Sequence, residues 1–172
     1  MEAKHVLEEV CGYQDLSRGI YLWYLIDKHK LKTALEIGTA SSFSTAWMVK
    51  AGATVTTIDI IDKSDESPDF LPEYDKSRVK RIIGDSTKVL PKLKQKFDII
   101  FIDGNHDYEF VKQDIINSLK MEPKFIVMHD YNIEAGVTQA IDEVLGKPSK
   151  VIIDDFNKKD AGIVVWRKNE EV

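Results

Sequence analysis

The stretch Leu35-Glu-Ile-Gly-Thr-Ala-Ser-Ser-Phe-Ser-Thr45 joins an apolar run to an amphipathic segment. Small residues in such a turn let a ligand approach the backbone, and the helix that follows offers unpaired N–H groups. Gly38 is the only glycine in this stretch, whereas a turn that binds a dinucleotide pyrophosphate usually contains several. The carboxylate of Glu36 would also repel a pyrophosphate, and it favours a ligand with positive charge, such as an amino group or a sulfonium. The stretch therefore predicts a strand, a ligand-binding turn and a helix.

Short apolar runs rich in Ile, Val and Phe recur along the chain and are nearly continuous. Such runs are typical of strands buried on both faces of a parallel sheet. They lie at Ala34–Ile37, Val55–Ile60, Val79–Ile83, Phe97–Ile102 and Phe125–Met128. The segments between them repeat apolar residues at helical spacing. This alternation predicts a Rossmann-like, doubly wound α/β sheet with right-handed crossovers and helices on both faces.

The last two apolar runs, Val151–Ile153 and Ile163–Trp166, are separated by a polar stretch with no helical pattern. They should pair antiparallel, which gives a seven-stranded, mostly parallel sheet with a C-terminal antiparallel hairpin. We expect a single domain over residues 1–172, with an N-terminal helical cap (1–32) and a Rossmann-like core (33–172). We also expect a helix from Asp85 or Ser86 to about residue 95, with Pro91 as its weak point.

Composition limits the class of partner and the compartment. The net charge of -5 and the pI of about 5.4 disfavour a nucleic-acid partner, because phosphate binding needs clustered Lys and Arg. Cys11 is the only cysteine, so no intrachain disulfide can form. The first ten residues do not resemble a signal peptide, and no apolar run reaches the roughly 18–20 residues that span a bilayer. The sequence therefore predicts a cytoplasmic protein that does not enter a membrane.

Asp59 ends the second apolar run, about 20 residues after the ligand-binding turn. An acidic residue at this point of the fold accepts hydrogen bonds from ribose hydroxyls. The alternative is that Asp59 only caps a helix or shapes a turn. Because NAD and S-adenosylmethionine both contain ribose, Asp59 does not separate them, whereas Glu36 and the scarcity of glycines favour S-adenosylmethionine.

Five stretches in order resemble class I S-adenosylmethionine-dependent methyltransferases. The resemblance is to the small branch that includes catechol-type and macrocin-type O-methyltransferases and cephalosporin-hydroxylase-like proteins. The stretches are LEIGTASSFST (35–45), TTIDI (56–60), IIGDSTKVLPKL (82–93), FDIIFIDGNHDYEFVKQDI (97–115) and FIVMHDY (125–131). With the terminal hairpin, they cover nearly everything from about residue 33 onward.

This resemblance implies a binding site for S-adenosylmethionine above the turn. The implied contacts are Glu36, Gly38 and Asp103 at the methionine end, Ser44 at its carboxylate, Asp59 at the ribose, Ile60 against the adenine face, Asp85 and Ser86 at the adenine edge, and Thr39 within the same site. The family turn often has glycine where this chain has Ala40 and Ser42. These two residues fit if their φ angles are negative.

Two predicted strands end in polar clusters, residues 103–107 and 129–132. If these strands are neighbours, Asp103 and Asp130 come together, and carboxylates so placed need a proton or a cation such as Mg²⁺ between them. The resemblance implies a metal site made of Asp103, Asp130 and a neighbour, which is His129 or Tyr131. Histidine as a softer ligand would shift the preference towards Mn²⁺, Fe or Zn²⁺. The alternative is that Asp130 caps the next helix and His129 packs against the sheet edge.

His106 lies three residues after Asp103, where relatives often place a base. Its ordinary pKa near 6.5 suits proton removal from a hydroxyl group. The alternative is that His106 only shapes its loop. Asp103, His106 and Asp130 are thus the catalytic candidates for methyl transfer to an oxygen atom of a small-molecule acceptor.

Other functions remain open at this point, because fold alone does not determine function. They are a NAD-dependent oxidoreductase, a non-catalytic Rossmann-like binding module, and non-methyl chemistry on the same fold.

The 61–77 loop is either a surface insertion or a lid that forms part of the substrate wall. Tyr21, Trp23 and Tyr24 belong either to the core or to the acceptor pocket, and an exposed apolar N-terminal patch would suit a homodimer.

Overall fold

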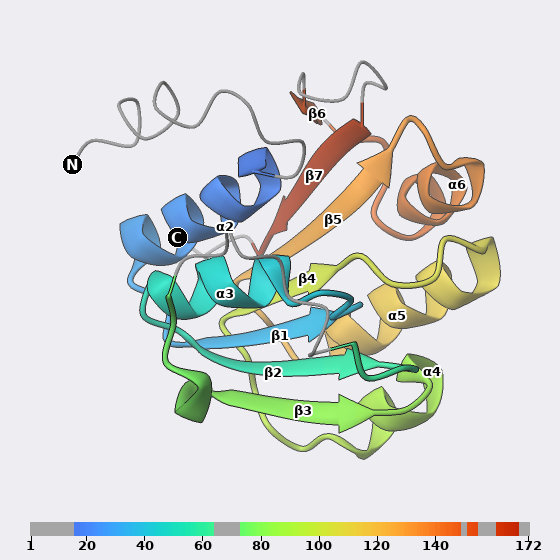
Figure 1. Cartoon of the computed structure of the whole chain (residues 1–172). Coiled ribbons are helices and arrows are strands. Elements are labelled where there is room, and N and C mark those ends of the chain that lie inside the picture. Colours follow the sequence, from blue (N-terminus) through green and yellow to red (C-terminus); the bar gives the residue numbers. More distant parts are fainter. Residues whose placement is uncertain (1–15, 64–72, 149–150, 155–160, 169–172) are drawn as a thin grey trace.

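The structure is a computed structural model that describes residues 16–63, 73–148, 151–154 and 161–168. Seven strands form one sheet in the order β3-β2-β1-β4-β5-β7-β6 (Figure 1). Their bounds are β1 Thr33–Ile37, β2 Thr54–Asp59, β3 Val79–Ile83, β4 Ile99–Ile102, β5 Phe125–Tyr131, β6 Val151–Asp154 and β7 Ala161–Arg167. The prediction of a seven-stranded Rossmann-like sheet is therefore confirmed.

The pairing of the strands explains where a ligand can bind. β1 pairs in parallel with β2 on one side and with β4 on the other, so the strand order reverses at β1. In doubly wound sheets, ligands bind at the carboxyl ends of the strands beside such a reversal. β7 lies between β5 and β6 and pairs antiparallel with both, which confirms the predicted C-terminal hairpin.

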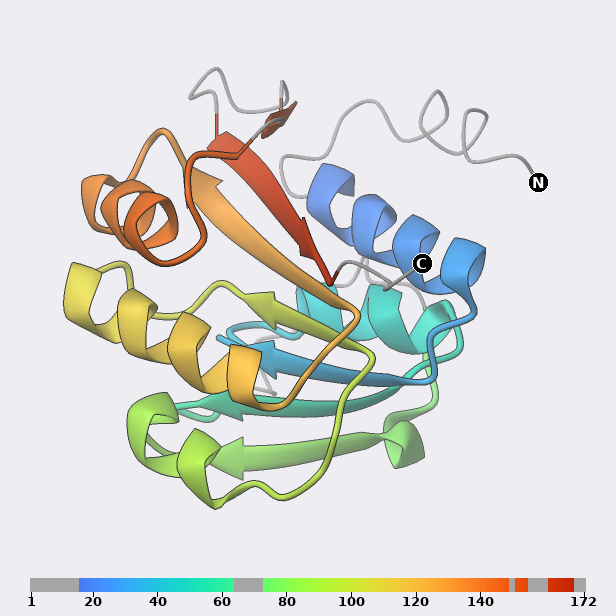
Figure 2. The ribbon, with the colours of Figure 1, turned by 180° about the vertical axis from the view of Figure 1, so that it is seen from behind.

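Helices cover both faces of the sheet, as Figures 1 and 2 show from opposite sides. α2 (Leu16–His29) and α3 (Phe43–Lys50) pack on one face, and α4 (Ser86–Val89), α5 (Tyr108–Lys120) and α6 (Ala135–Val144) cover the other. Alternate strand residues point to the two faces. Leu35 and Ile37 therefore join the core under α5 and α6, whereas Ala34 joins the core under α2 and α3.

The helix predicted from Asp85 or Ser86 to about residue 95 is wrong in length. The α-helix α4 ends at Val89, and a short 3₁₀ helix follows from Leu90 to Lys92. Pro91 has no N–H group and its ring clashes with the preceding turn, so it fits the first turn of a helix but not its interior. The prediction of the cap is confirmed, because the side chain of Asp85 accepts a hydrogen bond from Thr87 N at 3.0 Å.

Several sequence-based expectations fall on residues outside the described ranges. Cys11 and the first part of the N-terminal cap (1–15) are outside them, as are residues 64–72 of the long loop. Within the described chain, α2 buries Leu22 and Ile26 completely, while Tyr21, Trp23 and Tyr24 are half-buried. In these same ranges, no helix has both the length and the apolar character required to cross a membrane.

Candidate functional site

A cleft of about 490 Å³ opens at the carboxyl ends of β1, β2 and β4. Six of the residues predicted to bind the cofactor line it: Gly38, Asp59, Ile60, Asp85, Ser86 and Asp103. These residues come from four separate loops, so the fold brings together what the sequence predicted to share a ligand. The cleft also includes Lys63, Asn105 and Phe110, which sequence reasoning missed. No sequence motif marks these three residues, because each is a single residue in a loop or in the first turn of a helix.

Gly38 lets the turn after β1 pack directly against the end of β4. Its φ angle is 96°, and a Cβ on Gly38 would lie only 2.0 Å from the carbonyl oxygen of Asp103. Ala40 and Ser42 have φ angles of 41° and 70°. The condition of negative φ, under which these two residues would fit the turn easily, is therefore not met, because the tight turn holds both in the left-handed region that glycine adopts more easily.

Asp59 stabilises this strained turn from the neighbouring strand. One carboxylate oxygen accepts hydrogen bonds from the backbone N–H groups of Thr39 at 2.9 Å and Ala40 at 2.8 Å. The other oxygen accepts one from Ile61 N at 3.1 Å. Asp59 thus shapes a turn, as the alternative proposed, and it is also one of the residues that line the cleft. Beside it, Ile60 is 70% exposed, which leaves an apolar side chain on the wall of the cleft.

Glu36, Thr39 and Ser44 are not among the residues that line the cleft. Glu36 is fully buried, and it accepts hydrogen bonds from the hydroxyl groups of Thr45 and Thr57, the latter at 2.6 Å. The Thr39 hydroxyl contacts Thr57 Oγ1 at 2.5 Å, so a chain of hydroxyl groups links the turn to the carboxyl group. Burial raises the pKa of Glu36 from 4.5 to about 7, although the two threonine hydroxyls oppose the rise.

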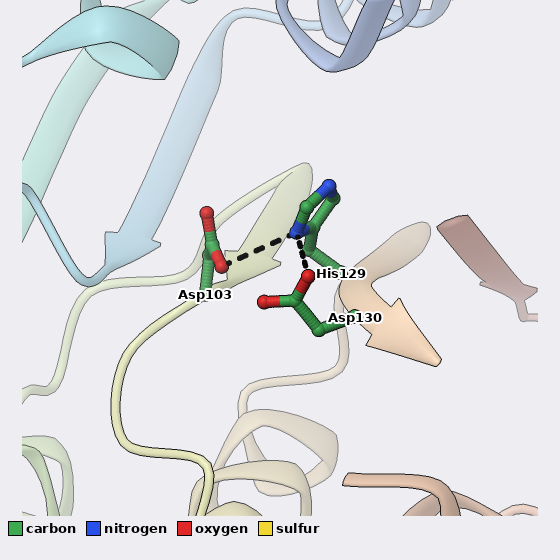
Figure 3. Close-up of side chains that lie close together, drawn as sticks. All are labelled: Asp103, His129 and Asp130. Atoms are coloured by element: carbon green, nitrogen blue, oxygen red, sulfur yellow. Dashed lines mark ion pairs between the residues drawn. The ribbon is translucent and has the colours of Figure 1, made fainter. Parts of the chain in front are cut away.

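Asp103, His129 and Asp130 converge at the ends of β4 and β5, as Figure 3 shows. One potential ligand atom from each residue lies within 4.8 Å of the other two. His129 Nδ1 is 2.9 Å from Asp130 Oδ1 and 3.6 Å from Asp103 Oδ1. The expectation that neighbouring strands bring Asp103 and Asp130 together is therefore confirmed.

An irregularity in β5 allows two consecutive side chains to face this cluster. In a regular strand, His129 and Asp130 would point to opposite faces. The pairing of β5 with β7 shifts register between Met128 and Tyr131, and Asp130 has a φ angle of 61°. Such a bulge re-aims side chains. It brings both residues to the site, which sequence periodicity alone does not predict.

His129 is buried between carboxylates without good hydrogen bonds. Burial opposes the charged ring, but Asp103 and Asp130 outweigh it and raise the pKa of His129 to about 9. Neither ring nitrogen makes a hydrogen bond of acceptable angle, although the 2.9 Å contact with Asp130 is short enough for one. A buried, unsatisfied histidine beside two carboxylates is a donor set that suits a divalent cation.

His106 reaches the same cluster from the loop before α5. Its Nε2 atom is 3.1 Å from Asp130 Oδ2, and its Nδ1 atom is 3.8 Å from Glu134 Oε1. The side chain is 39% exposed, so it is accessible to a ligand. The loop itself is held by Asn105, whose side chain accepts a hydrogen bond from Asp107 N at 2.7 Å. Shaping of the loop therefore falls to Asn105, while His106 faces the carboxylates.

Arg18 of α2 is a further member of the site that the sequence analysis missed. Its Nη1 atom lies 3.2 Å from Asp103 Oδ2. Arg18 is far from Asp103 in the sequence, and no pattern in the N-terminal segment pointed to it.

A second cavity, of about 400 Å³, lies between the end of α6 and β7, and its lining includes none of the predicted site residues. The predicted site residues therefore do not belong to this second cavity.

The chain was compared with protein families, curated sequences and solved structures. A family model described as a methyltransferase domain matches residues 35–131. Among curated protein sequences, no match is found. Solved structures share the fold at low identity, so they bear on architecture alone.

Three such structures come from bacteria. An O-methyltransferase from Bacillus cereus in complex with SAH is 18% identical, with a TM-score of 0.67 over 96% of this chain and 90% of that one. TomG, an O-methyltransferase from Streptomyces achromogenes solved with SAM, is 18% identical, with a TM-score of 0.69 over 97% and 86%. The N-methyltransferase NodS from Bradyrhizobium japonicum, bound to S-adenosyl-l-homocysteine, is 15% identical, with a TM-score of 0.68 over 99% and 100%. Because the family model covers more than half of the sequence, from the ligand-binding turn to the end of β5, this chain belongs to the methyltransferase-domain family.

Proposed function

We propose that this protein is an S-adenosylmethionine-dependent methyltransferase that transfers a methyl group to an oxygen atom of a small molecule. The observation that carries this proposal is that Gly38, Asp59, Ile60, Asp85, Ser86 and Asp103 all line the same cleft. The cleft places an acidic residue next to an exposed apolar one, which suits a ribose beside a flat purine ring. Structural neighbours solved with SAM or SAH support the same ligand.

The residues at the opposite end of the cleft fit a positively charged amino acid group. Asp103 lines the cleft, and Glu36 lies buried near it, with one carboxyl oxygen that lacks a hydrogen-bond partner. A sulfonium and an ammonium group are both stabilised by nearby carboxylates. Glu36, Thr39 and Ser44 lie behind the lining, so we assign them to support of the turn and of the start of α3.

Bound S-adenosylmethionine supplies the electrophilic methyl group. The chain supplies orientation and a proton acceptor. His106, which is 39% exposed and lies beside Asp130 and Glu134, is our candidate to take the proton of an acceptor hydroxyl group. When bound, the cofactor would give up its methyl group as the acceptor oxygen bonds to the methyl carbon and the bond from that carbon to sulfur breaks, with S-adenosylhomocysteine as the other product.

A divalent ion, Mg²⁺ or Mn²⁺, fits the donor set of Asp103, His129 and Asp130. The supporting observation is the buried His129 ring, which has no acceptable hydrogen bond on either nitrogen. When bound, such an ion would lower the pKa of a coordinated hydroxyl group. The same cluster and His106 are the reasons to favour an oxygen acceptor, because the fold alone is shared with N-methyltransferases.

Binding of the cofactor can be tested without knowledge of the acceptor. Titration calorimetry of the full chain should detect S-adenosylmethionine and S-adenosylhomocysteine but not NAD, and the same ligands should raise the melting temperature. Ile60→Ala should weaken adenosyl ligands several-fold, whereas Ile61→Ala is the matched control. Both side chains are largely exposed, at 70% and 57%, so neither change should affect folding. Stabilisation by NAD alone would overturn the proposal.

The acceptor atom needs a separate measurement. The protein is incubated with S-adenosylmethionine and a panel of small hydroxylated and amino compounds, and the formation of S-adenosylhomocysteine and methylated product is followed by mass spectrometry. Turnover with hydroxyl groups supports the proposal. Turnover with amino compounds alone would contradict the oxygen assignment, and cofactor binding without any turnover would favour a non-catalytic binding module.

A further inference from the structure

The strained turn after β1 has a support that comes from the edge of the sheet. Ser42, the residue before α3, has a φ angle of 70°, in the left-handed region that residues with a Cβ seldom adopt. Ser42 is fully buried, and its hydroxyl group accepts a hydrogen bond from Arg81 Nη2 at 2.7 Å. Arg81 belongs to β3, the edge strand next to β2 (Figure 1). A side chain of β3 therefore reaches across β2 to the turn.

The register of the sheet explains this reach. Glu36, Thr57 and Arg81 are paired across β1, β2 and β3, so their side chains form a row on one face of the sheet, the face that α3 covers. Within this row, Thr57 contacts the hydroxyl group of Thr39, and Arg81 contacts that of Ser42. The row thus holds the turn near both of its ends.

Ser42 does not use its hydroxyl group as a serine at the start of a helix usually does. Such a serine normally has an extended backbone and accepts a hydrogen bond from the first turn of its own helix. Ser42 is left-handed and makes no cap hydrogen bond with its side chain. Its hydroxyl group is bonded to Arg81 instead. Because a charged donor makes a stronger hydrogen bond than a neutral one, this contact can hold a backbone conformation that serine would otherwise leave.

Glycine would not need this support, because it adopts positive φ angles about as readily as negative ones. In the turn of this chain, Asp59 holds Ala40 through the backbone N–H group, and Arg81 holds Ser42 through the side chain. Ala40 lines the cleft, whereas Ser42 and Arg81 are not among the lining residues. A change at Ser42 or Arg81 should therefore affect a ligand through the shape of the turn.

We propose that Arg81 is a positioning residue for the ligand-binding turn. Its hydrogen bond to Ser42 takes the place of a glycine and keeps the turn in the conformation that binds the cofactor. The inference rests on the proposed function, in that the ligand of the cleft is an adenosyl compound. It assigns a role in binding to a residue of the edge strand, outside the lining of the cleft.

The test measures the affinity of S-adenosylhomocysteine for variants of the full chain by titration calorimetry. Ser42→Ala and Ser42→Gly both remove the hydroxyl group, but only alanine keeps the Cβ that strains a left-handed backbone. Ser42→Ala should weaken the ligand about 5- to 30-fold, which is the population ratio that corresponds to the cost of this region for a residue with a Cβ. Ser42→Gly should change the affinity by less than about threefold.

Arg81→Met removes the donor and should weaken the ligand by the same factor as Ser42→Ala. The double variant should lose no more than either single variant, because both remove one interaction. Combined with Ser42→Gly, Arg81→Met should have no further effect. Arg78→Met is the matched control, because it removes the same charge from a side chain that donates a hydrogen bond to Gly52 O, on the loop before β2. It should leave the affinity unchanged.

Equal affinities of Ser42→Ala and Ser42→Gly would show that Arg81 does not offset backbone strain, and they would overturn the inference. So would a loss in Arg81→Met that persists when residue 42 is glycine, since Arg81 would then act through its charge or on the fold alone. The two single variants of Ser42 keep Arg81, so they decide the matter even if Arg81→Met does not fold. A wild-type chain that does not bind S-adenosylhomocysteine would contradict the proposed function itself, and the inference would fall with it.

Discussion

Gly38 lies directly against Asp103, since a Cβ on Gly38 would be 2.0 Å from the Asp103 carbonyl oxygen. Asp103 N in turn donates a hydrogen bond to Ile37 O at 2.8 Å. The turn after β1 and the acidic end of β4 are therefore packed together as one unit. Any change that separates them should affect both the cleft and the acidic cluster.

Gly38→Ala should destabilise the protein by at least about 4 kcal/mol or prevent folding, because the backbone atoms of Asp103 and Gly104, just after β4, cannot give way. Gly52 provides a matched control. Its φ angle of 101° is close to the 96° of Gly38, but no atom lies within 4 Å of an added Cβ. Gly52→Ala should therefore cost only the backbone strain, about 1–2 kcal/mol. Urea unfolding measures both, and equal losses would contradict the close contact.

Ala40→Gly should stabilise the protein by about 0.5–1 kcal/mol. Ala40 has a φ angle of 41°, and glycine adopts this region without the steric cost of a Cβ, although it loses more entropy on folding. The hydrogen bond from residue 40 N–H to Asp59 remains available. Ala46→Gly in the interior of α3 is the control, and it should destabilise by about 1 kcal/mol or more. Destabilisation by both variants would show that the turn is not strained.

Glu36→Gln should stabilise the protein at alkaline pH and have little effect at pH 4. The pKa of Glu36 is about 7 in the folded chain and near 4.5 when unfolded. Between these values the folded state binds more protons, so stability contributed by this group falls as pH rises from about 4.5 to 7. The full difference is about 3 kcal/mol at most. The measurement is the free energy of unfolding of both proteins at pH 4, 6 and 8, and a pH-independent difference would contradict the raised pKa.

Mn²⁺ should bind to the chain, and Asp130→Asn should abolish or strongly weaken this binding. The pKa of His129 is about 9, so the ring holds a proton at neutral pH that a metal must displace. Mn²⁺ affinity should therefore rise with pH up to about 9, by up to about tenfold per unit. Electron paramagnetic resonance of free Mn²⁺ measures the titration. Glu109→Gln, which removes the same charge from an exposed residue of α5, should leave affinity unchanged.

Much of the site was predictable because the residues that end neighbouring parallel strands lie at the same edge of the sheet. Once β1, β2 and β4 are identified by their apolar runs, Asp59 and Asp103 must lie at the carboxyl edge of a parallel sheet. Short helices were less predictable. The segment after Asp85 has helical residues, but Pro91 divides it into α4 and a 3₁₀ turn, and local propensity gives no exact end point.

The sequence by itself determined the strand–helix alternation, the antiparallel hairpin and the acidic residues that end the strands, because periodicity and strand ends are local properties. Tertiary structure alone decided the left-handed φ angles of Ala40 and Ser42, the bulge that turns both His129 and Asp130 to the site, and the approach of Arg18 to Asp103. These features arise where elements distant in sequence press together. Close packing, and not the preference of any one residue, sets the backbone there.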